Sequence, residues 1–260
     1  MLENSLNNTS PGAVGRNHSR RFLTIVGLTT WVFSGFYLGQ FLLLGIVWLL
    51  EHLGVTFVVD GNPALQTTLA AIAYVLALSM VVGVPWVIGR HKTTKKDIGL
   101  TRLPSWMDIV LSPAGFVIYL LASAGLIALI SVIVPHFNID QAQDVGFQNL
   151  SDYYQYVLAF LTLVVIAPLA EEILFRGYLY GKLKKHIPFW VAMIVTSLLF
   201  GALHGQWNVA IDTFALSIVM CSLREVTGSI WAGILLHMIK NGVAFYFLFI
   251  NTSILHTLGG

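Results

Sequence analysis

The chain has 260 residues, of which 57% are hydrophobic and only 10% are charged, and its mean hydropathy is +0.79. Soluble domains are about 45–50% apolar and about 25% charged, so this composition excludes an ordinary soluble domain. The formal net charge is only +2 and no basic stripe alternates with aromatic residues, which argues against a nucleic-acid-binding protein. We therefore expect a lipid bilayer to surround most of the chain.

The apolar segments predict the fold. A transmembrane helix needs about 20 mainly apolar residues, and seven segments reach or approach this length: residues 22–50, 67–89, 107–134, 156–176, 188–204, 207–223 and 229–250. The sequence thus predicts an all-α, polytopic transmembrane helical bundle with about seven spans. The range is six to eight, because the fifth and sixth segments are short. Polar residues 1–21 are predicted to form a cytoplasmic N-terminal tail, and residues 251–260 a short C-terminal tail.

The basic residues predict the orientation. Apart from Lys240 inside the last span, every Lys and Arg lies before the first span or in alternate loops. The remaining loops hold acidic residues and no Lys or Arg: Glu51, Asp60, Asp140, Asp144 and Asp152. By the positive-inside rule, the N-terminus and the basic loops are cytoplasmic. We expect a multi-pass integral membrane protein, in the plasma membrane if the organism is a bacterium.

Ionisable residues inside membrane segments are costly and are candidates for a functional site. The first group lies in the sequence APLAEEILFRG, where Glu172 and Arg176 are four residues apart and can pair on one helix face. Glu171 lies about 100° further round the helix, where it can face another partner. The alternative is a solvated helix end that carries a surface salt bridge.

Two further groups follow. Phe200 and His204 share a helix face, and the small residues between them permit close helix packing. His237 and Asn241 stand at positions i and i+4, so both side chains point the same way. For His204, the alternative is an ordinary histidine at the membrane interface. For His237 and Asn241, the alternative is a hydrogen-bonded pair that only joins helices. Because all three groups follow residue 150, we expect residues 22–150 to be a scaffold and residues 151–250 to be the catalytic core.

The three patterns Glu-Glu-x-x-x-Arg, Phe-x-x-x-His and His-x-x-x-Asn occur in this order over about residues 155–245. They resemble the CPBP family of CAAX proteases and bacteriocin-processing proteins, which includes type II CAAX prenyl proteases and bacterial immunity-type proteins. The resemblance implies an intramembrane endopeptidase acting on membrane-associated peptides or lipidated protein C-termini. It implies four catalytic residues and three supporting ones: Glu171, His204, His237 and Asn241, with Glu172, Arg176 and Phe200 beside them.

The chemistry of these residue types fits peptide hydrolysis. A carboxylate in apolar surroundings ionises less readily, which suits a general base near neutral pH. We expect Glu171 to activate a water that His204 helps to hold, and the resemblance implies that His237 and Asn241 stabilise the oxyanion. One mismatch is that His204 lies further along its span than a site shared with Glu171 allows, so we expect the fifth helix to begin in the cytoplasm or to tilt.

Three alternatives remain open. The first is a zinc peptidase, because one carboxylate and two histidines with an open fourth position make a catalytic zinc site; we favour no cofactor. The second is a non-enzymatic bacteriocin-immunity protein. The third is a small transporter or proton relay, for which inverted repeats and helices interrupted in both halves would be expected, and the sequence has neither. The sequence identifies neither the substrate nor the oligomeric state.

Overall fold

The computed structural model describes residues 11–89, 93–134 and 150–251, with side chains from residue 19 onward; the expected tails at 1–10 and 252–260 lie outside this range. Within the described ranges every regular element is helical, which confirms the all-α prediction. The seven predicted segments correspond to seven helical rods. These are α1 (Pro11–His52); α2 (Pro63–Leu78) with η1 (Ser79–Gly83) and α3 (Val84–Gly89); α4 (Trp106–Ile133); α5 (Tyr153–Phe160) with η2 (Leu161–Ile166), α6 (Ala167–Glu172), η3 (Ile173–Tyr180) and α7 (Gly181–Leu183); α8 (Phe189–Ala202); α9 (Trp207–Thr227); and α10 (Trp231–Phe245) with η4 (Tyr246–Ile250).

Among the described residues, five rods are long and apolar enough to cross a membrane: α1 from Ser19, α2–α3, α4, α5–α7 and α10–η4. Helix α8 is shorter, and α9 carries Asp212 and Arg224. Helix α9 packs against α4, α8 and α10, and Asp212 and Arg224 make hydrogen bonds to other parts of the protein. The chain is an integral membrane protein.

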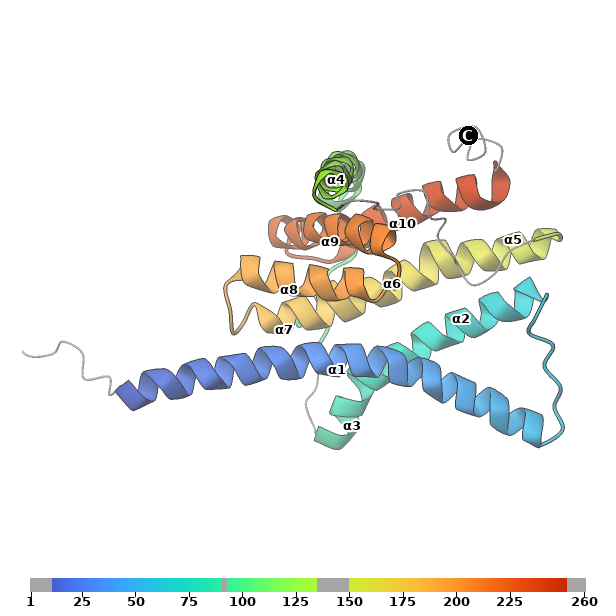
Figure 1. Cartoon of the computed structure of the whole chain (residues 1–260), viewed down its shortest axis with the longest axis horizontal. Helices are drawn as coiled ribbons and strands as arrows, with labels where there is room; N and C mark the ends of the chain where they lie inside the picture. Colours follow the sequence, from blue (N-terminus) through green and yellow to red (C-terminus); the bar gives the residue numbers. More distant parts are fainter. Residues whose placement is uncertain (1–10, 90–92, 135–149, 252–260) are drawn as a thin grey trace, which may run out of the picture.

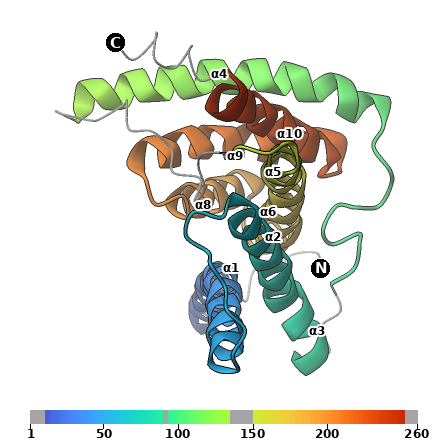
Figure 2. The same cartoon turned by 90° about the vertical axis from the view of Figure 1, so that its right-hand side faces the viewer.

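The rod α5–α7 lies at the centre of the molecule. In Figure 1 the hairpin of α1 and α2 lies on one side of it, and α8, α9 and α10 lie on the other. Half of its most apolar window (50%) is buried, compared with 17% for α1 and 11% for α2–α3. Helix α4 lies crosswise to these rods: it is seen end-on in Figure 1 and lengthwise in Figure 2. Residues on the central rod can therefore meet side chains from both sides.

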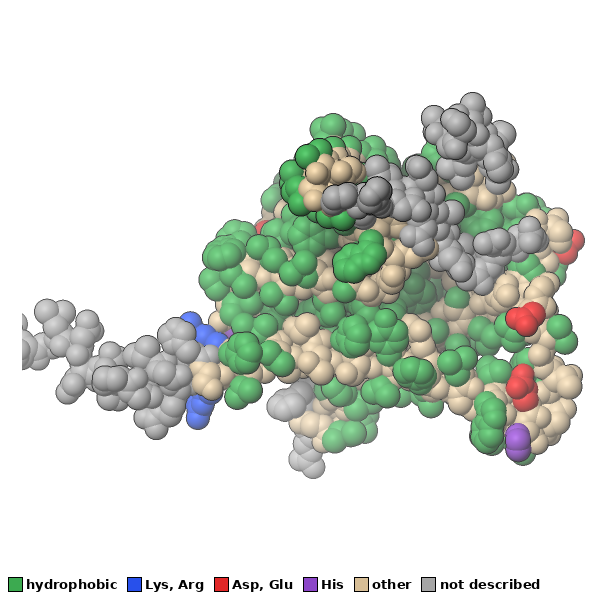
Figure 3. Space-filling model, viewed as in Figure 1, with side chains coloured by type: hydrophobic (Ala, Val, Ile, Leu, Met, Phe, Trp, Pro, Cys, Tyr) green, Lys and Arg blue, Asp and Glu red, His purple; other side chains and the backbone are tan. Residues whose placement is uncertain are grey.

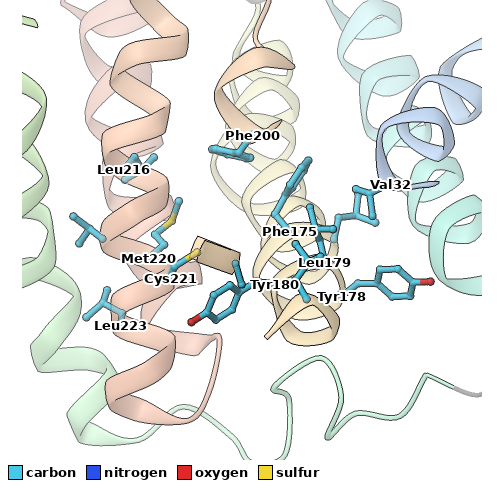
Figure 4. Packing of buried hydrophobic residues seen from close by; sticks show 14 of the residues in the cluster. Val32, Phe175, Tyr178, Leu179, Tyr180, Phe200, Leu216, Met220, Cys221 and Leu223 are labelled. Atoms are coloured by element: carbon cyan, nitrogen blue, oxygen red, sulfur yellow. The ribbon is translucent and has the colours of Figure 1, made fainter. Parts of the chain in front are cut away.

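Buried aromatic and aliphatic side chains join the central rod to its neighbours. Figure 4 shows Phe175, Leu179 and Tyr180 of η3 near Phe200 of α8 and Met220 of α9. Each of these five side chains is at most 1% exposed. Burying a large apolar side chain stabilises a fold by about 1.5–3 kcal/mol in water, but lipid is itself apolar, so here close packing contributes more than removal from solvent.

The helices α1 and α2 cross at two glycines. A Cβ atom on Gly39 would lie 2.6 Å from the backbone nitrogen of Ala77, and one on Gly35 would lie 2.6 Å from a methyl group of Val81. Small residues four apart let helix backbones approach this closely. Beyond the crossing the two helices diverge (Figure 1) and leave a groove of about 340 Å³, with Tyr74 in its wall.

The fourth predicted span, 156–176, is too short. The rod continues through η3 and α7 to Leu183, so Lys182 lies in a helix rather than in a loop. The sequence suggested an end near Arg176 because charged residues begin there, but Arg176 is fully buried among protein side chains. The longer rod places Glu171 three turns from its basic end, which reduces the mismatch in depth between Glu171 and His204.

Basic side chains concentrate toward one end of the molecule. On the face shown in Figure 3, Lys and Arg lie at the end where α1 begins, and most of the visible Asp and Glu lie at the opposite end. This separation is what alternate basic and acidic loops produce when consecutive spans run in opposite directions. Which end faces the cytoplasm stays a prediction.

Candidate functional site

The site is built around α6, a short α-helical segment between the two π-helical stretches η2 and η3. In a π-helix each N–H bonds to the carbonyl five residues back, as the Ala167 N–H does to Thr162. The next residue, Pro168, has no N–H, so the carbonyl of Leu163 lacks this donor. The side-chain amide of Asn241 donates a hydrogen bond to it instead, at 2.8 Å. Asn241 therefore joins α10 to the central rod just before the two glutamates.

Glu172 and Arg176 form the predicted pair. Glu172 Oε1 accepts a hydrogen bond from Arg176 Nη1 at 2.7 Å, and both side chains are fully buried. The same oxygen lies 3.2 Å from Nδ1 of His237. The other oxygen sits against Gly233, where an added Cβ would lie only 2.9 Å away. The absence of a side chain at Gly233 leaves room for the Glu172 carboxylate between the helices.

Glu171 faces other partners, as its position on the helix predicts. Its Oε1 accepts a hydrogen bond of 2.7 Å from the hydroxyl of Tyr74 on α2. Its Oε2 lies 3.7 Å from Nε2 of His237. The imidazole of His237 thus lies between the two adjacent carboxylates, with one ring nitrogen toward each. If Nδ1 carries a proton, its bond to Glu172 orients the ring so that Nε2 faces Glu171.

The ring of Phe200 lies at the centre of the second motif. Its centroid is 5.0 Å from the His204 ring and 6.0 Å from the His237 ring. The guanidinium of Arg176 lies over its face at 4.1 Å, within cation–π range. This explains the aromatic residue in the Phe-x-x-x-His pattern: the ring covers the cation of the ion pair and separates the two histidines.

His204 lies just after the end of α8. Its Nδ1 is 2.8 Å from the carbonyl oxygen of Phe200, which can only accept, so Nδ1 carries the proton and Nε2 is left to accept or to bind. The ring is also within electrostatic reach of Glu171 and His237. Of the two small residues in this motif, Gly201 does permit close packing, because a Cβ there would lie 2.6 Å from the carbonyl oxygen of Ala210. Ala202 is exposed.

Most of the predicted site residues come together. Direct contacts link five of them: Glu171, Glu172, Arg176, Phe200 and His237. His204 joins this group through the Phe200 ring. Asn241 contacts the same rod, but its hydrogen bond goes to the backbone of Leu163 and not to another predicted residue. One of its two amide N–H groups is thereby committed to the helix.

The structure brings two further residues into polar clusters. Tyr74 is a single tyrosine in an apolar span, and nothing in the sequence pairs it with Glu171. Asp212 lies inside the predicted sixth span, where its charge is a sequence signal for a polar cluster. It accepts hydrogen bonds from Tyr119 and Ser123 of α4 and lies 3.9 Å from Nζ of Lys240.

The described acidic and histidine side chains of the site do not form a metal centre. Within the described part of the chain, no group of three or more His, Cys, Asp or Glu side chains is placed to hold a metal ion. A catalytic zinc site takes three such ligands. The geometry of the described residues does not supply this set.

Comparison with known proteins identifies the central part of the chain. Residues 153–243 match the family model of the type II CAAX prenyl endopeptidase Rce1-like proteins. The chain carries an Rce1-like domain. This confirms the resemblance seen in the three motifs. The domain runs from the start of α5 into α10 and includes every predicted site residue, whereas Tyr74 lies outside it.

Curated relatives match about a third to a half of the chain. The chain is 29% identical over 136 residues to the putative membrane peptidase YdiL of Bacillus subtilis, which covers 52% of the chain and 54% of that protein. It is 27% identical over 97 residues to the membrane-embedded CAAX protease MroQ of Staphylococcus aureus, covering 35% of the chain and 39% of that protein. An uncharacterized 24.3 kDa protein of Escherichia coli is 32% identical over 87 residues, covering 32% of the chain and 40% of that protein. The alignments thus span about half or less of these three relatives, and no solved structure matches the chain.

Proposed function

We propose that the protein is an intramembrane endopeptidase that hydrolyses membrane-associated peptides or protein C-termini with a water activated by Glu171. One observation carries the proposal. The buried Glu171 carboxylate turns one oxygen toward His237 at 3.7 Å, inside an Rce1-like domain. A carboxylate next to an imidazole and away from bulk water has the groups needed for general-base chemistry.

The reaction would proceed by direct attack of water. Glu171 takes a proton from the water as the new O–C bond forms at the scissile carbonyl. The leaving nitrogen then takes that proton as the C–N bond breaks, which regenerates the carboxylate. No acyl-enzyme forms, so no nucleophilic Ser or Cys is needed.

The other residues would support this step. When both ring nitrogens of His237 carry protons, Nδ1–H would stay with Glu172 and Nε2–H would be donated to the oxyanion, and Asn241 has one amide N–H left for the same oxygen. His204 presents Nε2 and would help to hold the water. Arg176 would neutralise Glu172 and so keep the negative charge of the site on Glu171.

The substrates would be CAAX-type, prenylated C-terminal peptides or peptide precursors that lie in the bilayer. The first class is supported by the similarity to type II CAAX prenyl endopeptidases and to the CAAX protease MroQ. The basic end of the molecule would face the cytoplasm, and the residues before 150 would serve mainly as scaffold. The protein would then act in the plasma membrane if the organism is a bacterium.

The test uses the purified full-length chain in lipid vesicles with quenched fluorescent peptides. One peptide carries a farnesylated CAAX end, one is the same peptide without the lipid, and one is a bacteriocin-type precursor. We expect cleavage of at least one peptide by the wild type and none by Glu171→Ala, with equal amounts of folded protein. Cleavage that survives Glu171→Ala contradicts the proposal. The immunity alternative replaces the peptidase proposal under a different result. In that case the wild type cleaves no peptide but protects cells from a bacteriocin, and Glu171→Ala protects them equally well.

A second arm concerns the metal. The active protein is dialysed against a chelator, and its activity and bound zinc are measured. Full activity without metal supports a glutamate-type enzyme. Loss of activity that added zinc restores would assign the protein to the metallopeptidases.

A further inference from the structure

Tyr74 connects the N-terminal hairpin to the proposed catalytic carboxylate. Its hydroxyl donates a hydrogen bond of 2.7 Å to Oε1 of Glu171, 97 residues away in the chain. Its ring packs edge-on against Phe36 of α1, with centroids 6.4 Å apart. The close crossing of α1 and α2 at Gly39 and Ala77, one turn along α2 from Tyr74, holds that helix in place.

The charged and titratable groups around Glu171 come from four directions. His237 on α10 lies 3.7 Å away, and Glu172 is the next residue on α6. His204, just after α8, is within electrostatic reach. Among the described residues, Tyr74 makes the one side-chain hydrogen bond to Glu171 that meets normal geometry.

We propose that Tyr74 is a positioning residue for Glu171: its hydroxyl fixes one carboxylate oxygen so that the other faces His237. The inference rests on the proposed function. The last torsion of a glutamate side chain is broad and has no strong preference of its own, so a donor to one oxygen selects the orientation. In a site away from water, this donor also replaces hydration that the carboxylate has lost.

The inference changes the role of the N-terminal half. The residues before 150 were expected to be a scaffold, and the family match begins only at residue 153. Tyr74 extends the working site beyond that match onto α2. The site is then complete only when the hairpin of α1 and α2 is docked against α6.

The first experiment uses Tyr74→Phe, which removes only the hydroxyl and keeps the ring in the groove wall. A hydrogen bond to a charged group corresponds to about a ten- to hundredfold effect on rate. We expect kcat on the cleaved peptide to fall by this factor while KM changes less than twofold, because the carboxylate remains but is poorly oriented. The matched control is Tyr37→Phe on α1, whose ring packs against Phe33 and Phe36 rather than at the site; its kcat should match the wild type.

A second experiment needs no substrate. Dicyclohexylcarbodiimide modifies protonated carboxyl groups in apolar surroundings, and mass spectrometry reports the modification at Glu171, with Glu171→Gln as the blank. A donated hydrogen bond favours the ionised carboxylate, so Tyr74→Phe should increase the labelling of Glu171 several-fold at a given pH, and Tyr37→Phe should not. Tyr74→Gln, which keeps an N–H donor but loses the ring, should return labelling part of the way toward the wild-type level.

The outcomes separate the two proposals. Normal kcat and normal labelling in Tyr74→Phe overturn the positioning role. A parallel loss of thermal stability and kcat, with unchanged labelling, reduces Tyr74 to a packing residue and also overturns it. If the wild type cleaves no peptide and yet the labelling of Glu171 rises in Tyr74→Phe, the peptidase proposal fails and the positioning of Glu171 by Tyr74 stands.

Discussion

Two polar clusters lie within the helices of this protein, and they are built differently. In the Asp212 cluster (Asp212, Tyr119, Ser123 and Lys240), one carboxylate oxygen accepts two hydrogen bonds of 2.6 Å and the other lies 3.9 Å from a cation. In the glutamate cluster (Glu171, Glu172, Arg176 and His237), two carboxylates share one histidine, and three buried polar atoms, Glu172 Oε2 and Arg176 Nε and Nη2, have no partner among the described residues.

The two clusters therefore suit different roles. The bonding of the Asp212 cluster suits holding helices together, and that of the glutamate cluster suits chemistry. A buried polar group that is fully bonded stabilises one arrangement of helices, whereas unmet hydrogen-bonding capacity costs free energy and needs an explanation. Catalytic sites are where such a cost is tolerated. We therefore expect the glutamate cluster to affect activity and stability together, and the Asp212 cluster to affect stability alone.

The largest effect should come from Arg176→Met. Both members of the Glu172–Arg176 pair are 0% exposed, so the substitution leaves a buried carboxylate without its cation. Breaking a buried pair by removing one partner costs about 3–5 kcal/mol. Thermal unfolding in detergent measures the loss of stability, and the peptide assay should show loss of activity.

The double variant Glu172→Gln/Arg176→Met is the control. It removes both charges, so part of the lost stability should return while activity does not, because His237 loses its carboxylate partner. If Arg176→Met alone unfolds at the wild-type temperature, the pair is not a stabilising element and the contrast between the clusters weakens.

Asp212→Asn should have a smaller effect, of about 1–3 kcal/mol. The variant keeps the shape but removes the counter-ion of Lys240 and weakens the bonds from Tyr119 and Ser123. We expect lower thermal stability and an unchanged kcat at temperatures well below unfolding. A drop in kcat at full stability would place this cluster in the mechanism and remove the distinction between the two.

Pairs within one helix could be predicted from the sequence, and contacts between helices largely could not. Glu172 and Arg176 follow from their spacing, because positions i and i+4 share a helix face. The contacts of Glu171 with Tyr74 and of Asn241 with Leu163 span 97 and 78 residues. They depend on the crossing of α1 and α2 and on the π-helical turns of the central rod, and periodicity encodes neither.

The fourth span was predicted too short for a related reason. Charged residues from Arg176 onward suggested a loop, but a charge marks a helix end only where water is its neighbour. Here Arg176 lies under the Phe200 ring, and Lys182 lies over the ring of Tyr178 at 4.3 Å. Protein side chains therefore take the place of water along the last two turns of the rod.

Gly233→Ala tests how tightly the glutamate cluster is packed. Its Cβ would lie 2.9 Å from Glu172 Oε2, so the carboxylate must move. Overpacking of this kind costs about 1–3 kcal/mol, and we expect the lower end because a carboxylate can rotate. The fall in kcat should exceed the fall in stability, since Glu172 orients His237.

Gly242→Ala on the same helix is the matched control. A Cβ there would have its nearest neighbour, a methyl group of Val164, at 3.7 Å, which is an ordinary contact. We expect stability and kcat close to the wild-type values. Equal losses in the two variants would mean that any added methyl group on α10 is harmful and that Glu172 is not specifically displaced.

The smallest effect concerns a surface pair that belongs to neither cluster. Lys185 donates a hydrogen bond to Asp97 at 2.8 Å, and this bond together with those from Thr94 holds the pKa of Asp97 below its usual range. Because the folded pKa is lowered, the pair stabilises the protein fully above the unfolded pKa of about 3.9, and this contribution is lost progressively as the pH falls from there through the lowered pKa of the folded protein.

Both side chains are partly exposed, at 56% for Lys185 and 29% for Asp97, so water screens the pair and its contribution should stay below about 1 kcal/mol. Asp97→Asn should unfold at a slightly lower temperature than the wild type at pH 7, and the gap should begin to narrow as the pH falls below about 4. Asp60→Asn, at the exposed opposite end of the molecule, should show no such gap. A gap that does not narrow at all between pH 4 and pH 2 would show that Asp97 acts through the turn that its side chain makes with Thr94 and not through its charge.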